Sequence, residues 1–166
     1  MNVLIILFLV ILFSAVYAGW RGAPWVPTKK KDVERFLKLA NIESGQKVYD
    51  IGCGDGRIIC AASNAGAKAH GYEIFLAPYI FAKIKSLFYK NCKIKFKDFW
   101  SADLSDADVV YFFLMPHQYK KLEKKLKNEL KGGTKVIAYV WPIENWVPKK
   151  VDVLPNHSNL YLYEIN

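Results

Sequence analysis

A glycine-rich segment at residues 50–58 constrains the fold of this chain more than any other feature. The short apolar run at 47–51 has the composition of a buried strand, and a helical pattern follows the glycines. Gly52, Gly54 and Gly56 let the backbone turn sharply and expose its N–H groups at the start of a helix. A strand, a glycine turn and a helix in this order predict the first unit of a parallel α/β sheet.

The same alternation continues along the chain and predicts the fold class. Strands are expected at residues 47–51, 68–74, 93–96, 108–114 and 135–141, with a closing hairpin at 151–154 and 160–165. Helices are expected from residue 31 to about 45, from the glycines to about 65, and at 78–89 and 117–131. This pattern predicts an α/β fold with a doubly wound, mostly parallel seven-stranded sheet, in which ligands bind beyond the carboxyl ends of the strands.

An uncharged apolar segment at residues 2–19 stands apart from this domain. As a helix, its eighteen residues would span about 27 Å, which is enough for a thin bilayer core. We therefore predict a transmembrane anchor at residues 1–19, a proline-containing connector at 20–31 and a main domain at 32–166.

This apolar segment has two interpretations. Tyr17, Trp20 and Arg21 are residues expected at the interfacial end of a retained anchor. The lysines at 29–31 would then keep the main domain in the cytoplasm by the positive-inside rule. The alternative is a cleaved signal peptide, because residues 16–18 resemble a cleavage site, although the segment lacks a basic start.

The charge balance favours an acidic partner. The chain has 24 Lys and Arg residues against 15 Asp and Glu residues, and none of these precedes Arg21. Such a surface suits anionic lipid headgroups, nucleic acid or an acidic protein. The lysine-rich run at 120–131 is typical of a solvated helix face, which can also rest on an anionic membrane surface. Cys53, Cys60 and Cys92 lack metal-ligand spacing, so we expect no metal.

Two carboxylates flank the glycines and indicate the ligand. A dinucleotide fingerprint needs a glycine where this chain has Arg57, and Asp50 at the end of the first strand would repel a pyrophosphate. Asp50 instead suits a cationic amino group, whereas Glu73 at the end of the second strand can accept hydrogen bonds from ribose hydroxyls. An amino acid joined to a nucleoside describes S-adenosylmethionine. The loop residues predicted to bind this cofactor are Gly52, Cys53, Gly54 and Gly56.

The run from Asp50 to Gly56 resembles motif I of the class I, seven-stranded S-adenosylmethionine-dependent methyltransferases, which have a Rossmann-like fold. Further segments that follow one pattern are PWVPT at 24–28, GYE at 71–73, DFW at 98–100, DLS at 103–105 and LEKKL at 122–126. With the apolar N-terminal segment, this pattern is similar to the small membrane-anchored protein-lysine methyltransferases. Their mitochondrial members modify the ATP synthase c-subunit and the adenine nucleotide translocase.

The resemblance assigns further residues to the donor site. Pro27 and Thr28 belong to a segment expected to fold back over the donor, so the connector would also cover this site. Asp98 is expected to contact the adenine amino group, and Phe99 or Trp100 to cover the adenine ring.

Several polar residues in and around the motifs have two interpretations each. Asp55 and Arg57 either orient the donor or cap the following helix, and Asp103 is a weaker donor-site candidate or a turn residue. His70 and His157 are interpreted as structural.

The acceptor site is expected after the fourth and fifth strands. Pro116 and His117 follow the fourth strand, and His117 is either a catalytic base or a helix-capping residue. Glu144 follows the fifth strand between Trp141 and Trp146, where a lysine side chain could lie on the aromatic rings with its amine near the carboxylate. The alternative is that these residues have only a structural role and pack under the loop.

The sequence therefore predicts an S-adenosylmethionine-dependent protein-lysine N-methyltransferase that acts on a membrane-associated protein. The resemblance implies a membrane-embedded protein substrate such as an ATP synthase rotor subunit. The alternatives are a nucleic-acid methyltransferase, a small-molecule N-methyltransferase and a catalytically silent scaffold that binds the donor. The chain lacks the Asn/Asp-Pro-Pro-Tyr/Phe signature of many amino-group methyltransferases, so no nucleic-acid partner is expected. The oligomeric state is left open.

Overall fold

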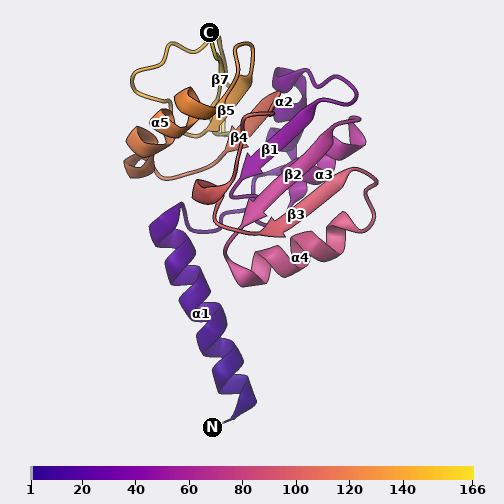
Figure 1. Cartoon of the computed structure of the whole chain (residues 1–166), viewed down its shortest axis with the longest axis vertical. Helices are drawn as coiled ribbons and strands as arrows, with labels where there is room; N and C mark the ends of the chain where they lie inside the picture. The colour runs from indigo at the N-terminus through magenta and orange to yellow at the C-terminus, as the bar shows by residue number, and fades with distance from the viewer. Residues whose placement is uncertain (1) are drawn as a thin grey trace.

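One mixed sheet of seven strands forms the centre of the computed structural model, which describes residues 2–166 (Figure 1). The strands are β1 (Lys47–Ile51), β2 (Lys68–Glu73), β3 (Cys92–Phe96), β4 (Val109–Phe112), β5 (Lys135–Tyr139), β6 (Lys150–Asp152) and β7 (Leu160–Glu164). They lie in the order β3-β2-β1-β4-β5-β7-β6. The first five are parallel, and β7 runs antiparallel to both β5 and β6. The predicted doubly wound α/β fold is confirmed.

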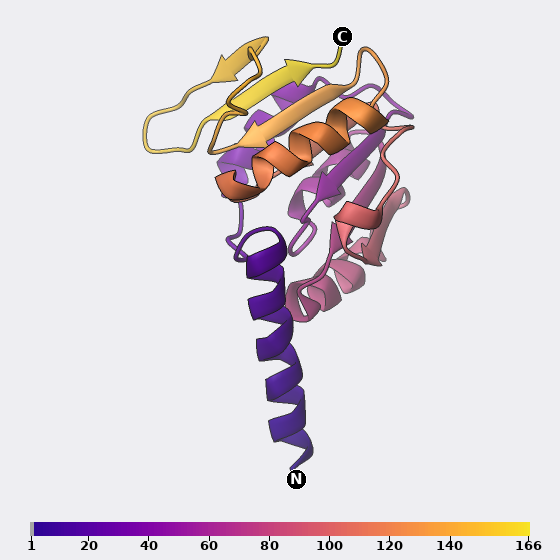
Figure 2. The same ribbon diagram turned by 60° about the vertical axis from the view of Figure 1, so that its left-hand side comes forward.

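Helices cover both faces of this sheet (Figure 2). The helices are α1 (Val3–Arg21), α2 (Lys30–Ala40), α3 (Arg57–Asn64), α4 (Leu76–Ser86) and α5 (Tyr119–Glu129), with short 3-10 turns η1 (Phe99–Ser101) and η2 (Pro116–Gln118). On one face α2, α3 and α4 pack around a core that includes Phe36, Ile59 and Ala82. On the other face α5 and η1 pack around Phe99 and Leu122.

The central strands are buried on both faces, as their apolar composition predicts. All four residues of β4 are buried, and successive residues point into opposite cores. Val109 and Tyr111 belong to the α2–α4 core, whereas Val110 and Phe112 belong to the α5 core. This double cover fixes the register of the sheet and aligns the carboxyl ends of β1, β2 and β4 at one edge.

Two predicted helix boundaries were wrong by several residues. The helix expected to run to about residue 45 ends at Ala40, because Asn41 adopts a left-handed conformation with φ of 44° that closes the helix. The helix expected at 78–89 begins at Leu76 and ends at Ser86. Pro78 lies in its first turn, where the missing N–H has no intrahelical partner to lose.

Helix α1 projects from the edge where the parallel strands end (Figures 1 and 2). It is 19 residues long with a mean hydropathy of 2.6, which is long and apolar enough to cross a membrane. Ala18 is its one buried residue, so nearly the whole helix lacks cover from the domain. The helix includes Trp20 and Arg21, which the sequence places in the connector, and residues 22–29 then lead to α2.

Candidate active site

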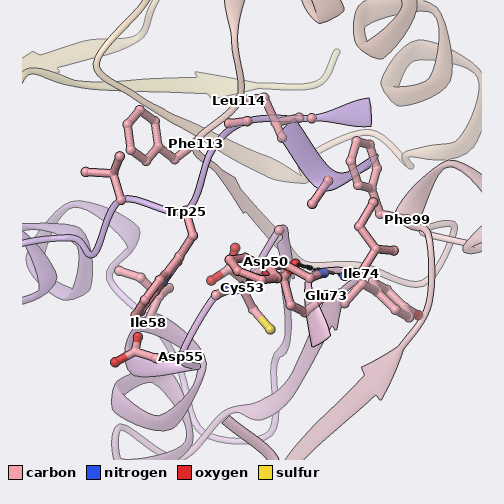
Figure 3. Close-up of a pocket in the computed structure, with 18 of the residues that line it drawn as sticks. Trp25, Asp50, Cys53, Asp55, Ile58, Glu73, Ile74, Phe99, Phe113 and Leu114 are labelled. Atoms are coloured by element: carbon pink, nitrogen blue, oxygen red, sulfur yellow. Dashed lines mark hydrogen bonds between the residues drawn. The ribbon is translucent and has the colours of Figure 1, made fainter. Parts of the chain in front are cut away.

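A pocket lies at the carboxyl ends of β1, β2 and β4 (Figure 3). Its walls come from five parts of the chain that are distant in sequence. They are residues 22–28, which we call the strap, residues 52–55, 57 and 58 of the glycine loop and the helix after it, residues 72–75 at the end of β2, residues 97 and 99, and residues 111, 113 and 114, together with Ala18 and Asp50. The pocket thus lies where the sequence places the donor site.

Asp50 supplies a buried carboxylate to this pocket. It is 2% exposed, and within the described chain its Oδ1 atom has no hydrogen-bond partner. Burial raises the pKa of Asp50 well above its usual range, and the nearby carboxylates of Glu73 and Asp55 raise it further. A carboxylate that is buried without a partner calls for a cationic ligand group, as the amino group of S-adenosylmethionine would be.

Glu73 joins the end of β2 to the glycine loop. Its Oε2 accepts a hydrogen bond from the Gly54 N–H at 2.7 Å, and its Oε1 accepts from the N–H groups of Ile74 at 2.8 Å and Phe75 at 2.7 Å. Burial raises the pKa of Glu73, and these three N–H donors partly offset that effect. A carboxylate has about four acceptor sites, so Glu73 keeps the capacity to accept a bond from a ribose hydroxyl.

The three loop glycines have different structural roles. Gly52 and Gly54 line the pocket with φ of 112° and 53°, a left-handed backbone that glycine adopts readily. A Cβ atom on Gly54 would lie 2.8 Å from both Cδ1 and Nε1 of Trp25, so any side chain there would displace that ring. Gly56 lies outside the lining, and its backbone instead approaches Ala82 of α4.

Cys53 also lines the pocket between Gly52 and Gly54. Burial raises the pKa of its thiol, so Cys53 provides apolar contact surface and lacks thiolate reactivity at neutral pH.

The strap forms one wall of the pocket. Pro27, Thr28 and Trp25 line the pocket, and in Figure 3 the Trp25 ring extends from the strap toward the glycine loop. Arg57 donates a hydrogen bond to the Thr28 carbonyl, while its Nε donates to Asp55 at 2.8 Å. Asp55 and Arg57 therefore tie the loop to the strap.

The structure places Asp98 differently from the expectation. The Asp98 carboxylate accepts hydrogen bonds from Arg21, including one at 2.9 Å from Nε, and caps η1 through the Trp100 N–H at 3.1 Å. It is absent from the pocket lining, which Phe99 and Lys97 form at this point. The structure therefore places the Asp98 carboxylate beside Arg21 and outside the pocket lining.

The three residues predicted for the acceptor site line one groove, which is separate from the donor pocket. Pro116, His117 and Glu144 are exposed and line a hollow between η2 and the loop after β5, which we call the acceptor groove. None of them lines the donor pocket. The sequence predicted their common edge but not this separation.

Phe113 is one of the pocket residues that the sequence did not predict. It lines the donor pocket, and its ring stacks on Trp141 with centroids 5.8 Å apart. It therefore connects the pocket with the loop that forms the acceptor groove. In the sequence, Phe113 lies within an uninterrupted apolar run that predicts a strand. Only its place at the carboxyl end of that run could have indicated a role in the site.

The remaining polar candidates have structural contacts. The Asp103 side chain accepts a hydrogen bond from the Ser105 N–H at 2.9 Å, so it forms a turn. His70 stacks on Tyr49 with centroids 4.9 Å apart. His157 lies in the turn between β6 and β7, and its Nδ1 is 2.8 Å from the buried Asp32 carboxylate. All three lie outside the donor pocket.

The fold and the pocket together define a class of protein. The sheet, the glycine loop after β1 and the acidic residues at the ends of β1 and β2 are those of the class I S-adenosylmethionine-dependent methyltransferases. A solved RNA methyltransferase from Salinibacter ruber in complex with S-adenosyl-L-homocysteine superposes with a TM-score of 0.80 and 32% identity, covering 84% of this chain and 94% of that one. The predicted cofactor, S-adenosylmethionine, is confirmed.

The sequence comparisons identify the family within this class. Residues 50–150 match the model of the ANTKMT methyltransferase domain. A protein-lysine N-methyltransferase of Saccharolobus islandicus is 38% identical over 86% of this chain and 93% of its own length. The ATP synthase c-subunit lysine N-methyltransferase of Xenopus laevis is 35% identical over 77% of this chain, which spans 58% of the frog protein. The chain belongs to the ANTKMT methyltransferase domain family, a family of protein-lysine N-methyltransferases.

Proposed function

We propose that this chain methylates the side-chain amine of a lysine in a membrane-embedded protein. The observation that carries the proposal is the place of the donor pocket. Its wall includes Ala18 and Gly22, from the end of α1 and the residue directly after it. The pocket therefore lies where the apolar helix meets the domain, within reach of a protein surface that emerges from the same bilayer.

This proposal treats α1 as a retained anchor. Trp20 and Arg21 end the helix, and the lysines at 29–31 follow closely. Under the positive-inside rule this arrangement favours a domain that faces the cytoplasm. N-terminal sequencing of the purified protein tests retention, because a cleaved signal peptide would remove the segment that ends near residue 18.

The pocket residues have distinct tasks in binding the donor. The Asp50 carboxylate would bind the amino group of the donor, and Glu73 would accept a hydrogen bond from a ribose hydroxyl. The glycine loop would let the donor lie close to the protein backbone. When bound, S-adenosylmethionine supplies an electrophilic methyl group on a sulfonium. The strap, held by Arg57, would exclude water from the pocket, and Phe99 would contact the adenine.

The acceptor amine must present its lone pair at the edge of this pocket. A lysine with a pKa near 10.4 is mostly protonated at neutral pH, so the site must favour the neutral form by removing water. The stacked rings of Phe113 and Trp141 supply an apolar surface for the lysine stem. We assign Pro116, His117 and Glu144 to contact with the acceptor protein around that lysine, because they line the open groove beside these rings.

The first substrate to test is a small rotor subunit of an ion-translocating ATPase. The frog relative is named for the ATP synthase c-subunit, and a mouse relative, 34% identical over 86% of this chain, is named for the adenine nucleotide translocase. Both names describe enzymes that act on a protein lysine, which supports a protein substrate for this chain.

An RNA acceptor is the second candidate, since the Salinibacter ruber structure is named an RNA methyltransferase. The excess of 24 basic over 15 acidic side chains would also suit a nucleic acid.

A transfer assay with methyl-labelled donor separates these candidates. Purified full-length chain would be mixed with membranes of the source organism in one tube and with its RNA in another, and the products hydrolysed. Methyl-lysine in one small membrane protein is the expected result. Label in RNA would overturn the lysine proposal in favour of the second candidate. Label in neither tube would overturn both and leave a donor-binding fold.

A further inference from the structure

Helix α4 and the turn after it expose an unusual number of large apolar side chains. Phe81 is 62% exposed, and Leu87 and Phe88 are 76% and 81% exposed. Ile80 and Ile84 are exposed on the same side. Exposed apolar side chains that gather on one surface indicate an interaction site, whereas scattered ones are ordinary.

The helical spacing of α4 places this apolar stripe away from the sheet. The buried residues of the helix are Pro78, Ala82 and Ser86, which recur every four residues and face the core. At 100° per residue, Ile80, Phe81 and Ile84 point to the opposite side. Small residues thus pack on the sheet, while the bulky apolar ones point outward.

Lysines border this stripe on both sides. Lys83 precedes Ile84 and Lys85 follows it, so the two lysines lie at opposite margins of the apolar face. The Lys83 side chain is exposed, whereas the Lys85 ammonium pairs with Asp55 of the glycine loop. This pattern of an apolar face with cationic margins is typical of a helix that lies in a membrane interface with anionic headgroups.

The stripe is continuous with α1. The N–H of Leu76, the first residue of α4, donates a hydrogen bond to Ser14 Oγ in α1 at 3.4 Å. Leu76 and Phe96 face α1 across a groove lined otherwise by Ile6, Leu9, Val10, Phe13 and Ser14. Both views of the ribbon show the start of α4 beside the upper part of α1 (Figures 1 and 2).

This contact fixes the depth of α4 relative to a bilayer around α1. Ser14 lies seven residues before Arg21, which corresponds to about 10 Å along the helix axis. A bilayer whose interface lies at Trp20 and Arg21 would therefore reach the start of α4. Interfacial helices are buried about 5–10 Å into the headgroup and acyl boundary, so the depths agree.

We propose that the outward face of α4 and its following turn, residues 80–88, lies in the lipid–water interface as a second membrane contact. The partner is the bilayer itself, with anionic headgroups at Lys83 and acyl chains at Phe81 and Phe88. The proposal rests on α1 being a membrane anchor and is independent of the identity of the methyl acceptor.

This second contact would also set the orientation of the donor site. Ala82 packs against Gly56, and Lys85 donates hydrogen bonds to the carbonyl and the carboxylate of Asp55 at 2.9 and 3.0 Å. The glycine loop is thus joined directly to the helix that lies on the membrane. One transmembrane helix alone would leave the domain free to tilt, whereas two contacts hold the pocket at a fixed height above the lipid.

Helix α5 supplies the matched control. Its outward face carries charged residues, such as Lys127, which pairs with Glu123 at 2.7 Å, and its apolar residues Leu122 and Leu126 are buried. The structure gives this face no apolar surface to insert, so we expect it to stay in water.

Site-directed fluorescence of the full-length chain in vesicles tests the proposal. Cys92→Ser removes the one partly exposed cysteine, and a single new cysteine is labelled with an environment-sensitive fluorophore. The sites are Phe88→Cys on the stripe, Val10→Cys in α1 and Lys124→Cys on α5. Vesicles of phosphatidylcholine and phosphatidylglycerol carry nitroxide-labelled lipids as quenchers, and aqueous iodide reports exposure to water. Donor-induced thermal stabilisation checks that each variant is folded.

The expected result is that lipid nitroxides remove most of the fluorescence at positions 10 and 88 but not at 124. Quenching of position 88 by iodide, with position 10 still quenched by lipid, would overturn the α4 contact and leave the anchor. Protection of position 88 from both quenchers would overturn the lipid partner in favour of a protein partner. A water-exposed position 10 would overturn the anchor and, with it, this proposal. None of these outcomes changes the label recovered in the methyl-transfer assay.

Discussion

The two halves of the sheet edge differ in how firmly the fold holds their polar side chains in place. At the ends of β1 and β2, Asp50 and Glu73 are buried, and Glu73 accepts three backbone hydrogen bonds. At the ends of β4 and β5, His117 and Glu144 are exposed in an open groove. The first half is preorganised, whereas the second presents side chains that the domain itself does not hold in place.

This difference follows from the ligands that the two halves would receive. A small molecule brings no folded surface that could hold the binding groups in place. The fold itself must therefore position every group that binds it before binding. A protein acceptor brings a surface of its own, and it would bury the acceptor groove only when it docks. Substitutions in the donor half should therefore have large effects on donor binding, and those in the acceptor half smaller effects on the acceptor alone.

The largest effect is expected for Gly54→Arg. A side chain there would collide with Trp25, because even a Cβ atom would lie 2.8 Å from its ring. Donor affinity by calorimetry should fall at least about 100-fold, or roughly 2.8 kcal/mol. Gly133→Arg is the matched control, since Gly133 has a similar positive φ of 84° but open space around it. Equal donor affinities in the two variants would refute the placement of the pocket.

Asp50→Asn should weaken donor binding and also stabilise the donor-free chain. The amide lacks the charge that would bind the donor amino group, so affinity should fall about 10- to 100-fold, or 1.4–2.8 kcal/mol. It also removes a buried carboxylate that lacks a partner, so the free energy of unfolding at neutral pH should rise by roughly 1 kcal/mol. Thermal unfolding with and without donor measures both; a variant that binds the donor normally would exclude Asp50 from the site.

The stabilising effect of Asp50→Asn should depend on pH. Burial raises the pKa of Asp50 in the folded chain above its unfolded value of about 3.9. Its contribution to stability is therefore fully present below about pH 3.9 and is lost as the pH rises through the folded-state pKa. The difference in unfolding free energy between Asp50→Asn and the unaltered chain should grow from acidic to neutral pH. A difference that is the same at every pH would assign the effect to packing.

Arg57→Ala should have an intermediate effect, because it releases the strap without changing the pocket floor. The substitution removes the hydrogen bond to the Thr28 carbonyl and leaves Asp55 with Lys85 as its remaining ion-pair partner. Donor affinity should fall about 10-fold, or 1.4 kcal/mol, close to the lower end of the range for hydrogen bonds to charged groups. Arg57→Lys keeps the charge, so its donor affinity should lie between those of Arg57→Ala and the unaltered chain. An unchanged donor affinity in Arg57→Ala would show that the hydrogen bond from Arg57 to the strap does not contribute to donor binding.

The smallest effects are expected in the acceptor half. Trp141→Ala removes the ring stacked on Phe113 and should raise the KM for a protein acceptor about 5-fold, while donor affinity stays unchanged. Glu144→Gln should change that KM by less than about 3-fold, as expected for an exposed charge. Steady-state kinetics with the acceptor found in the transfer assay measures both. A large loss of kcat in Glu144→Gln would instead make this carboxylate part of the chemistry.

Much of the donor half could be predicted from the sequence because its signals are local. The strand before the glycines, the turn itself and the carboxylates at 50 and 73 depend on short stretches of chain with a regular spacing. The strand-helix alternation then implies a parallel sheet, and a parallel sheet brings the ends of consecutive strands to one edge. These steps needed no knowledge of distant contacts.

The features that could not be predicted depend on partners far away in the chain. Asp98 has the residue type and position of a donor contact, but Arg21, 77 residues earlier, pairs with its carboxylate. Phe113 looks like any strand residue until Trp141 is placed against it. The apolar residues of α4 are typical of an ordinary covered helix, yet the structure leaves them exposed beside α1.

The sequence by itself determined the fold class, the apolar helix and the chemistry of the donor site, because periodicity and local motifs act over a few residues. Only the tertiary structure decided how far the acceptor groove lies from the donor pocket, what holds the strap and which helix face lacks cover. Those properties depend on which side chains meet across the sheet edge, and their packing is set by the whole chain at once.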